Sequence, residues 1–350
     1  MFNLSMLRVL SSASGAKPGK QVLISKNESK EDMFKVLISD AMSSKAEEIC
    51  GASDKIQVDV KAGISPEDLK ACIGEYNGLL VRSRTKVTDE VIAKADNLKV
   101  IGRAGIGVDN IDLKSASEKG IFVENAPTGN AITTAEHAIS LMMSLARHIP
   151  QATASLKSDK WEKKKYQGSE IFEKNLGIIG LGNIGKIVAD RAQGLKMNVF
   201  AFDPVVSEAD AKALGITLVS FDELLKTCDF FSIHAPFNDK TKGMLNDAAF
   251  AKMKKGACII NAARGGIVDE KACLTALNND TLAGAAFDVF EKEPPDEGHP
   301  LIKHPRVICT PHLGASTKEA QIKVAVIVAE QMVDYAERGE TRNVVNKNML

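Results

Sequence analysis

Three residues near the end of the chain have side chains suited to acid–base chemistry and anion binding. Arg264, Glu293 and His312 each stand in a polar segment that follows a predicted strand. In open α/β sheets, ligands bind where strands reach their carboxyl ends. We therefore take these three residues as the candidate catalytic set.

The three residue types suit the removal of a hydride from a 2-hydroxy acid. The hydroxyl proton must leave with the hydride, so the reaction needs a base that works near neutral pH, and histidine serves this best. A carboxylate beside the histidine would hold its tautomer, and an arginine would bind the substrate carboxylate in a bidentate manner and polarise the reacting oxygen. From spacing alone, each residue could equally be an ordinary turn or loop residue.

A glycine motif predicts a nucleotide site. The sequence GLGNIG at 180–185 directly follows the apolar run 176–179 and precedes a helical stretch. In this pattern Gly180 would make the tight turn, Gly182 would let the backbone approach a pyrophosphate, and Gly185 would let helix and strand pack closely. The helix N-terminus would offer free N–H groups to the phosphates.

An acidic residue in the right place favours NAD as the cofactor. Asp203 lies 18 residues after Gly185, at the end of the next predicted strand. Its carboxylate would accept hydrogen bonds from the adenosine ribose and would repel a 2′-phosphate. The following residues are Pro204, Val205 and Val206, so no arginine is present to favour NADP.

The elements that must position these residues alternate between strand and helix from residue 34 onward, which predicts an α/β fold with parallel sheets. Apolar runs predict a first series of strands at 34–39, 56–60, 78–81 and 100–101, and a second series at 176–179, 198–202, 230–234, 258–261, 282–289 and 307–310. Helical patterns cover 133–147 and 318–337. We expect two Rossmann-like lobes built on doubly wound parallel sheets.

Composition excludes several classes of protein. The 350 residues suggest about two domains, and 45 basic residues balance 45 acidic ones. A basic nucleic-acid-binding protein is therefore not expected, and no apolar run reaches the ~18 residues of a membrane span. The six cysteines form no C-x-x-C pair, so we predict reduced thiols and no metal site.

The first 33 residues differ from the rest. No acidic residue precedes Glu28, and the residues before it include five serines and four basic residues. This composition is typical of a transit peptide or of a disordered leader. We expect a cytoplasmic protein, with a mitochondrion or plastid as the alternative if the segment is a transit peptide.

The ordered motifs resemble those of the D-isomer-specific 2-hydroxyacid dehydrogenases. The resemblance runs from about residue 34 to 346. Besides the glycine motif it is carried by VRSRTKVT at 81–88, GRAGIGVDN at 102–110, ARGGIVDE at 263–270 and PHLGAST at 311–317.

The resemblance implies a role for each candidate. Arg264 would bind the carboxylate and polarise the carbonyl, and Glu293 would pair with His312, the acid–base. Asp288 would bind the nicotinamide carboxamide. The remaining cofactor residues implied are Gly180, Gly182, Asn183, Ile184 and Gly185 at the pyrophosphate, Asp203 at the ribose, and Ala235, Ala262, Ala263 and Gly314 along the cleft.

The resemblance also implies a division of the chain. Residues 34–132 and 318–350 would form a discontinuous substrate-binding lobe, because the C-terminal helix returns to it. Residues 133–317 would form the NAD-binding lobe, through which the family forms homodimers. Longer relatives carry a regulatory ACT domain, and since only four residues follow Asn346 we expect a short form without it.

Within the family, the arginine pair favours a phosphorylated substrate. Arg82, Ser83 and Arg84 follow a predicted strand and would concentrate positive charge around a phosphate. Asn130 matches a substrate contact, and Lys163 matches a lysine that reaches the neighbouring subunit's site. The expected reaction is the NAD-dependent oxidation of 3-phospho-D-glycerate to 3-phosphohydroxypyruvate in serine biosynthesis.

Two alternatives stay open. One is a glyoxylate or hydroxypyruvate reductase, or another D-2-hydroxyacid dehydrogenase. The other is an NAD-sensing binding protein similar to the carboxy-terminal-binding corepressors, which would show an apolar peptide cleft in place of Arg82 and Arg84. The chain departs from the common family pattern at Ile106, where threonine is frequent, and at His137, where leucine is more usual.

Overall fold

The structure, a computed structural model, describes residues 33–350. The predicted leader therefore lies outside the described residues. Within the described range the predicted α/β fold is confirmed, because two separate sheets are built entirely of parallel strands with helices between them.

The first sheet has five strands in the order β2-β1-β3-β4-β5. They are β1 Phe34–Ile38, β2 Ile56–Val60, β3 Gly78–Val81, β4 Val100–Arg103 and β5 Phe122–Asn125. All neighbouring pairs are parallel. The strand order changes direction between β1 and β3, which makes the carboxyl ends of these two strands a topological switch point.

The second sheet has seven strands in the order β12-β11-β10-β9-β6-β7-β8. They are β6 Asn175–Ile179, β7 Asn198–Phe202, β8 Thr217–Leu218, β9 Phe230–Ile233, β10 Ala257–Asn261, β11 Leu282–Phe287 and β12 Val307–Cys309. The switch point of this sheet lies between β6 and β9, and the glycine motif follows β6 directly.

Two strands were not predicted. The run β8 has only two residues, which is too short to give a periodic signal. The strand β5 has the sequence FVEN, and its polar second half masks the apolar run. Tertiary packing nevertheless buries Glu124 and Asn125 at the end of β5.

The helices begin where the sequence offers capping groups. Seven capping side chains each accept a hydrogen bond from the first turn of the helix that follows: Ser65, Asp112, Ser207, Ser220, Asn246, Asp269 and Thr317.

The helices flanking the first sheet are α1 Lys45–Gly51, α2 Pro66–Cys72, α3 Asp89–Ala93 and α4 Leu113–Glu118, with a short 3₁₀ turn η2 Ile73–Glu75. Those that follow are α5 Ala131–Arg147, α6 Ile149–Lys157, α7 Asn183–Gly194, α8 Glu208–Ala213, α9 Phe221–Thr227, α10 Asp247–Phe250, α11 Glu270–Asn278, α12 Pro300–Lys303, α13 Lys318–Arg338 and the 3₁₀ turn η3 Lys347–Met349.

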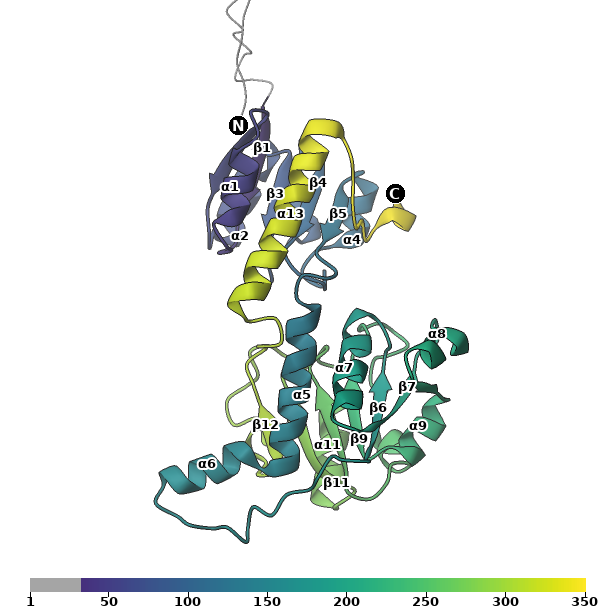
Figure 1. The fold of residues 1–350 in the computed structure, drawn as a ribbon. Helices are drawn as coiled ribbons and strands as arrows, with labels where there is room; N and C mark the ends of the chain where they lie inside the picture. Colours follow the sequence, from purple (N-terminus) through teal and green to yellow (C-terminus); the bar gives the residue numbers. More distant parts are fainter. Residues whose placement is uncertain (1–32) are drawn as a thin grey trace, which may run out of the picture. The chain divides into compact units, whose positions relative to one another are not determined.

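The last long helix returns to the first sheet, as the yellow ribbon in Figure 1 shows. Val324 and Val328 of α13 pack in one apolar cluster with Val36 and Leu80 of the strands. The backbone at Val344 then forms an antiparallel bridge to β5. This packing supports the discontinuous lobe of residues 34–132 and 318–350, whose boundaries stay a prediction.

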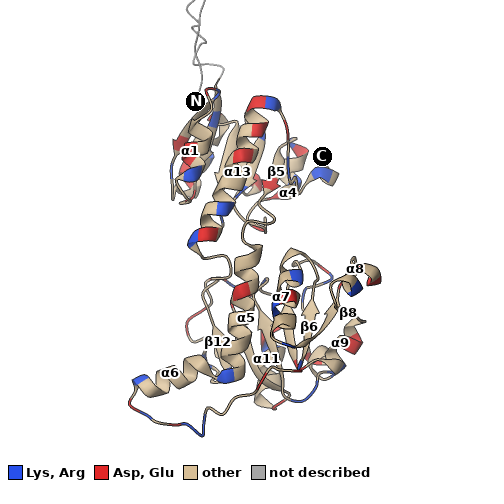
Figure 2. Cartoon of the chain, viewed as in Figure 1, with Lys and Arg blue, Asp and Glu red and all other residues tan. Residues whose placement is uncertain are grey.

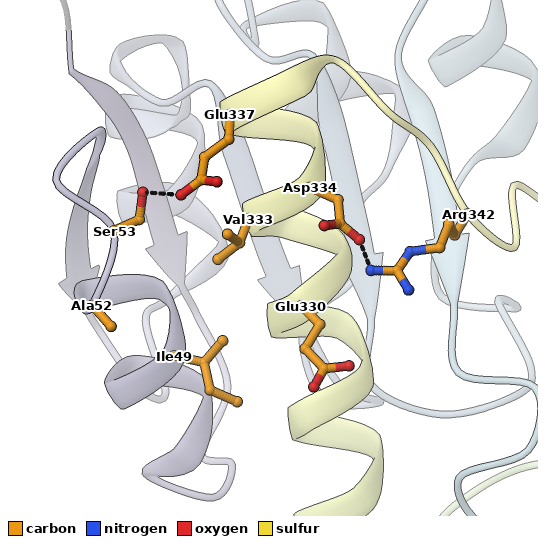
Figure 3. A pocket seen from close by; sticks show the side chains of 8 residues that line it. All are labelled: Ile49, Ala52, Ser53, Glu330, Val333, Asp334, Glu337 and Arg342. Atoms are coloured by element: carbon orange, nitrogen blue, oxygen red, sulfur yellow. Dashed lines mark hydrogen bonds and ion pairs between the residues drawn. The ribbon is translucent and has the colours of Figure 1, made fainter.

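Figure 2 shows charged residues along α1 and α13, two helices that pack against the first sheet. A shallow pocket of about 420 Å³ lies between these helices (Figure 3). Its polar groups largely partner each other, since Ser53 donates to Glu337 at 2.8 Å and Arg342 pairs with Asp334. We therefore assign this pocket no ligand.

Within the described range, no helix combines the length and the apolar character needed to cross a membrane. The same residues contain no cluster of histidine, cysteine and carboxylate side chains arranged to hold a metal ion. All six cysteines lie in this range and are free thiols.

Glu124 on β5 is a fully buried carboxyl group at the junction with the C-terminal segment. Its Oε1 accepts the backbone N–H of Arg342, and its Oε2 has no hydrogen-bond partner among the described residues. Burial raises the pKa of Glu124 to about 8, because no cation compensates for the lost hydration. The nearby Gln331 donates to the carbonyl oxygens of Asn125 and Arg342, and its own Oε1 is also buried without a partner.

This buried group predicts that stability falls as the pH rises. The folded-state pKa of Glu124, about 8, exceeds the ordinary value of 4.5. The folded protein therefore holds a proton that the unfolded chain loses between these values, and the free energy of unfolding decreases across that range. Replacing Glu124 with Gln should remove on the order of 2 kcal/mol of this decrease between about pH 5 and pH 8, measured by denaturant unfolding.

The exposed Glu118→Gln variant is the matched control and should keep the wild-type pH dependence. If the free energies of unfolding of wild type and Glu124→Gln changed with pH in parallel, Glu124 would not be held neutral in the folded protein.

Candidate active site

The glycine motif forms a sharp turn between β6 and α7. Gly180 has a φ of +93°, and a Cβ there would lie 2.7 Å from the backbone nitrogen of Ala235. A Cβ at Gly185 would collide with the carbonyl oxygen of Gly180, so glycine is required for the close approach of helix and strand. By contrast, a Cβ at Gly182 would meet nothing within 4 Å. The turn therefore leaves open space in front of the α7 N-terminus.

The N-terminus of α7 has the features of an anion site. The helix begins at Asn183, and no side chain of the described residues caps it. Its first N–H groups, including those of Asn183 and Ile184, have no partner within the helix itself. Open space and free donors fit the pyrophosphate of a dinucleotide.

Asp203 follows β7 and is bonded to the glycine turn. Its Oδ2 accepts the N–H of Leu181 at 2.7 Å, and its Oδ1 accepts the N–H groups of Val205 and Val206 at 2.8 and 3.2 Å. A carboxylate has about four acceptor positions. One position thus remains for a ribose hydroxyl, and the backbone fixes the direction in which the side chain points.

Three alanines and a glycine stand just beyond the carboxyl ends of β9, β10 and β12. Ala235 follows β9 and lies against Gly180. Ala262 and Ala263 follow β10, where the Asn261 side chain accepts from Ala263 N–H and donates to the Arg264 carbonyl. Gly314 lies beyond β12, next to Asp288.

Glu293 and His312 form a hydrogen-bonded pair. His312 Nδ1 lies 2.6 Å from Glu293 Oε2, and Glu293 Oε1 accepts the N–H of Phe290 at 3.1 Å. Burial raises the pKa of Glu293, but the hydrogen bond and charge of His312 and the Phe290 N–H outweigh it, so the pKa falls below 4.5. Glu293 is therefore ionised at neutral pH. The pairing through Nδ1 leaves Nε2 of the half-exposed His312 available to a substrate.

Asp288 is buried and accepts hydrogen bonds from several donors. Its Oδ1 accepts from Thr310 Oγ1 at 2.6 Å and Leu313 N–H at 2.7 Å, and its Oδ2 accepts from Gly314 N–H at 2.8 Å. His137 Nε2 lies 3.2 Å from Oδ1. Burial raises the pKa of Asp288, but these hydrogen bonds, that of His137 foremost, lower it below 3.8. Sequence reasoning set His137 aside, because nothing local signals its partner 151 residues away.

Arg264 is held by a carboxylate and a carbonyl. Its Nε donates to Asp109 Oδ2 at 2.8 Å, and its Nη1 donates to the Ala263 carbonyl at 2.7 Å. A Cβ at Gly107 would collide with the guanidinium, so glycine leaves room for this side chain.

The first sheet presents further arginines at its carboxyl edge. Asp40, after β1, accepts the Arg82 N–H at 2.6 Å, and Arg82 Nη1 donates to the Ala41 carbonyl at 2.9 Å. The guanidinium of Arg84 lies over Gly63, where a Cβ would collide with it. Ser83 is exposed between the two arginines.

Arg103, the last residue of β4, was missed. Its mostly buried guanidinium has an Nε with no hydrogen-bond partner among residues 33–350. Burial, followed by repulsion from Arg264 and Arg82, lowers the pKa of Arg103 to about 10. Three arginines therefore lie in one electrostatic neighbourhood. The signal that could have found Arg103 was its place at a strand end before Gly105 and Gly107.

Two predicted substrate residues are not joined to this cluster by any described hydrogen bond. Asn130 is buried at the N-terminus of α5, and its Oδ1 has no partner among the described residues. Lys163 is exposed in the segment between α6 and β6. The structure thus places Arg82, Arg103 and Arg264 in one group and Glu293, His312 and Asp288 in another. No described hydrogen bond joins Lys163 to either group.

Comparison with known proteins agrees with this geometry. Residues 139–314 match the D-isomer specific 2-hydroxyacid dehydrogenase, NAD binding domain. The chain is similar to a curated D-3-phosphoglycerate dehydrogenase of Archaeoglobus fulgidus, with 49% identity over 313 residues, which are 89% of this chain and 59% of the relative. For the enzyme of that name from Bacillus subtilis, the identity is 48% over 90% of this chain and 59% of the relative.

Among solved structures, a glyoxylate reductase from Paecilomyes thermophila superposes with a TM-score of 0.82 at 28% identity, covering 90% of this chain and 99% of that one. The chain spans about three fifths of the length of the curated relatives it matches. The chain belongs to the D-isomer specific 2-hydroxyacid dehydrogenases, and residues 139–314 are its NAD-binding domain.

Proposed function

We propose that the chain catalyses the NAD-dependent oxidation of 3-phospho-D-glycerate to 3-phosphohydroxypyruvate, the entry step of serine biosynthesis. The observation that carries this proposal is the largely buried Arg103 with two further arginines, Arg264 and Arg82, close enough to repel it, in the chain that also holds the Glu293–His312 pair. A substrate with a carboxylate and a phosphate at its two ends would neutralise this charge. The names of the curated relatives support the same reaction.

His312 would take the hydroxyl proton of the substrate. Its Nδ1 is bound to Glu293, so Nε2 is the nitrogen that would face the substrate hydroxyl. The ionised Glu293 would hold the imidazole orientation and stabilise the imidazolium that forms. NAD⁺, when bound, supplies the acceptor for the hydride that leaves C2.

Arg264 would bind the carboxylate and the reacting oxygen. Its Nε is held by Asp109, while its Nη2 is free of described partners and can donate to substrate. A guanidinium is suited to this double task because its N–H groups have a fixed planar geometry.

The phosphate would be bound by Arg82, Arg84 and Arg103, with Ser83 as a further donor. The Nη1 of Arg103 donates to the Ala104 carbonyl at 3.4 Å, but its buried Nε has no partner among the described residues. Because a buried donor without a partner is costly, Arg103 would gain from a dianionic ligand. Asn130, with its unpartnered Oδ1, is proposed as a further substrate contact.

The cofactor would lie along the carboxyl ends of β6, β7, β9 and β10. Gly180, Gly182 and Gly185 with the N–H groups of Asn183 and Ile184 would hold the pyrophosphate. Asp203 would accept a ribose hydroxyl and disfavour a 2′-phosphate. We assign Ala235, Ala262, Ala263 and Gly314 to the walls of this cleft, and the remaining acceptor position of Asp288 Oδ2 to the carboxamide.

We also propose a homodimer that forms through the NAD-binding lobe, residues 133–317. Support comes from large apolar side chains that stand exposed on α6 and the segment after it, namely Ile149, Leu156 and Trp161. Lys163, two residues beyond Trp161, would then reach the partner's substrate site.

A substrate panel tests the proposed reaction. We expect the purified chain to use 3-phosphoglycerate with NAD at a kcat/KM roughly 10²-fold above that for glycerate, because glycerate leaves the arginines unpaired. NADP should be a poor substitute. Steady-state kinetics in both directions measure this.

The Arg103→Met variant serves as the internal control for this panel. It should raise KM for 3-phosphoglycerate and leave the kinetics with glycerate nearly unchanged. A wild-type preference for hydroxypyruvate or glyoxylate over 3-phosphohydroxypyruvate would refute the proposal in favour of a reductase.

His312→Gln tests the acid–base assignment. Glutamine retains a polar side chain but transfers no proton at neutral pH, so kcat should fall by roughly 10²–10⁴-fold. NADH affinity, measured by fluorescence titration, should stay within about twofold of wild type. Near-normal turnover would remove His312 from the mechanism.

The dimer is tested by light scattering. The expected mass is twice the chain mass of 37.6 kDa. Trp161→Asp should shift the equilibrium toward the monomer, because it places a charge in the apolar interface, whereas the exposed Val205→Asp should not. A wild-type mass equal to one chain would contradict the proposal.

A further inference from the structure

His137, on the inner part of α5, contacts the loop that carries His312 although it is remote in sequence. Its Nε2 lies 3.2 Å from Asp288 Oδ1 and 3.1 Å from Thr310 Oγ1. The side chain is mostly buried. Neither the glycine motif nor the Arg264, Glu293 and His312 set accounts for a histidine at this position.

The hydrogen bonds of Thr310 determine which atom carries the His137 proton. Thr310 Oγ1 donates its hydrogen to Asp288 Oδ1 at 2.6 Å, so it can only accept from His137. An ionised Asp288 is also an acceptor only. The His137 Nε2 must therefore be protonated and donates toward both oxygens.

Asp288, the hydrogen-bond partner of His137, binds loop residues on both sides of His312, the proposed base. The Asp288 carboxylate accepts from Thr310, Leu313 and Gly314, and the Asp288 carbonyl accepts the His312 N–H at 2.9 Å. These donors all belong to residues 310–314. Within this stretch His312 has a φ of +54°, a left-handed conformation that costs energy for a residue with a Cβ.

His137 is the one described donor to this carboxylate that comes from outside residues 310–314. It fixes the carboxylate from the side of α5, a helix whose Ala135, Ala138 and Met142 pack in the core of the second sheet. A leucine at this position would have a comparable size but no donor. The loop would then be held by Asp288 without an external anchor.

We propose that His137 is a positioning residue of the reaction: by donating from Nε2 to Asp288 and Thr310 it holds the strained loop that presents His312 to the substrate. The inference rests on the proposed role of His312 as acid–base. It does not depend on which 2-hydroxy acid is the substrate, because every such substrate gives up the same hydroxyl proton. No proton is transferred through His137.

The test compares three substitutions. His137→Leu removes the donor, His137→Gln restores an N–H close to the position of Nε2, and His137→Asn carries an amide too short to reach Asp288. A misplaced base lowers the rate of proton transfer more than it affects binding. We expect kcat to fall roughly tenfold or more in the Leu and Asn variants and to recover to within about threefold in the Gln variant, with KM changed by less than about twofold.

A second measurement is independent of turnover. In protein labelled at histidine, the imidazole resonances of His312 should shift in the Leu and Asn variants and return close to the wild-type position in the Gln variant. The exposed neighbour Glu136→Gln on the same helix is the control and should leave both measurements unchanged. If the Leu variant does not fold, the comparison of Gln with Asn still decides the question.

The outcomes separate this inference from the proposed function. Equal kcat and an unshifted His312 signal in the Leu and Asn variants would overturn the role of His137. A wild-type enzyme that oxidises another D-2-hydroxy acid would refute the phosphoglycerate proposal alone, and the His137 series would then be measured with that substrate.

Discussion

The loops at the carboxyl ends of β11 and β12 depend on the hydrogen bonds of the buried Asp288 carboxylate. A lone carboxylate in this position would be strongly destabilising, because burial removes its hydration. The chain compensates with hydrogen bonds from Thr310, Leu313, Gly314 and His137. The donors of Thr310, Leu313 and Gly314 can reach the carboxylate only if residues 310–314 fold tightly around it. The solvation of one buried charge thus determines the path of the backbone through His312.

A second constraint acts on the first sheet, where the buried charge is positive. Arg103 is largely buried beside Arg82 and Arg264, and Asp40 and Asp109 reduce this repulsion only in part. The folded chain therefore keeps an excess of positive charge at the carboxyl ends of β3 and β4. Such an arrangement opposes folding, and a bound dianion would relieve it. If these arginines bind the substrate as proposed, the same group would affect both stability and substrate affinity.

Sheet topology also places some of the proposed ligand-binding residues. In the first sheet, Asp40 after β1 and Arg82 after β3 flank the point where the strand order changes direction. In the second, Gly180 after β6 and Ala235 after β9 do the same. At such points adjacent loops diverge to opposite faces and leave room for a ligand. Arg82, Gly180 and Ala235, which are proposed to bind substrate or cofactor, therefore lie at these two openings.

The sequence by itself determined the local features of this protein. The glycine turn at 180–185, the acidic residue Asp203 at the end of the next strand and the parallel α/β class could be predicted. Each depends on residues close together in the chain or on the pattern of apolar residues along it. The pairing of Glu293 with His312 came from the family resemblance. Only the tertiary structure brought His137 to Asp288, Arg103 to Arg264 and Glu124 to the backbone of Arg342. Each of these pairs joins residues more than 100 positions apart. The pairs depend on burial and on neighbouring charges, and both exist only after the chain has packed.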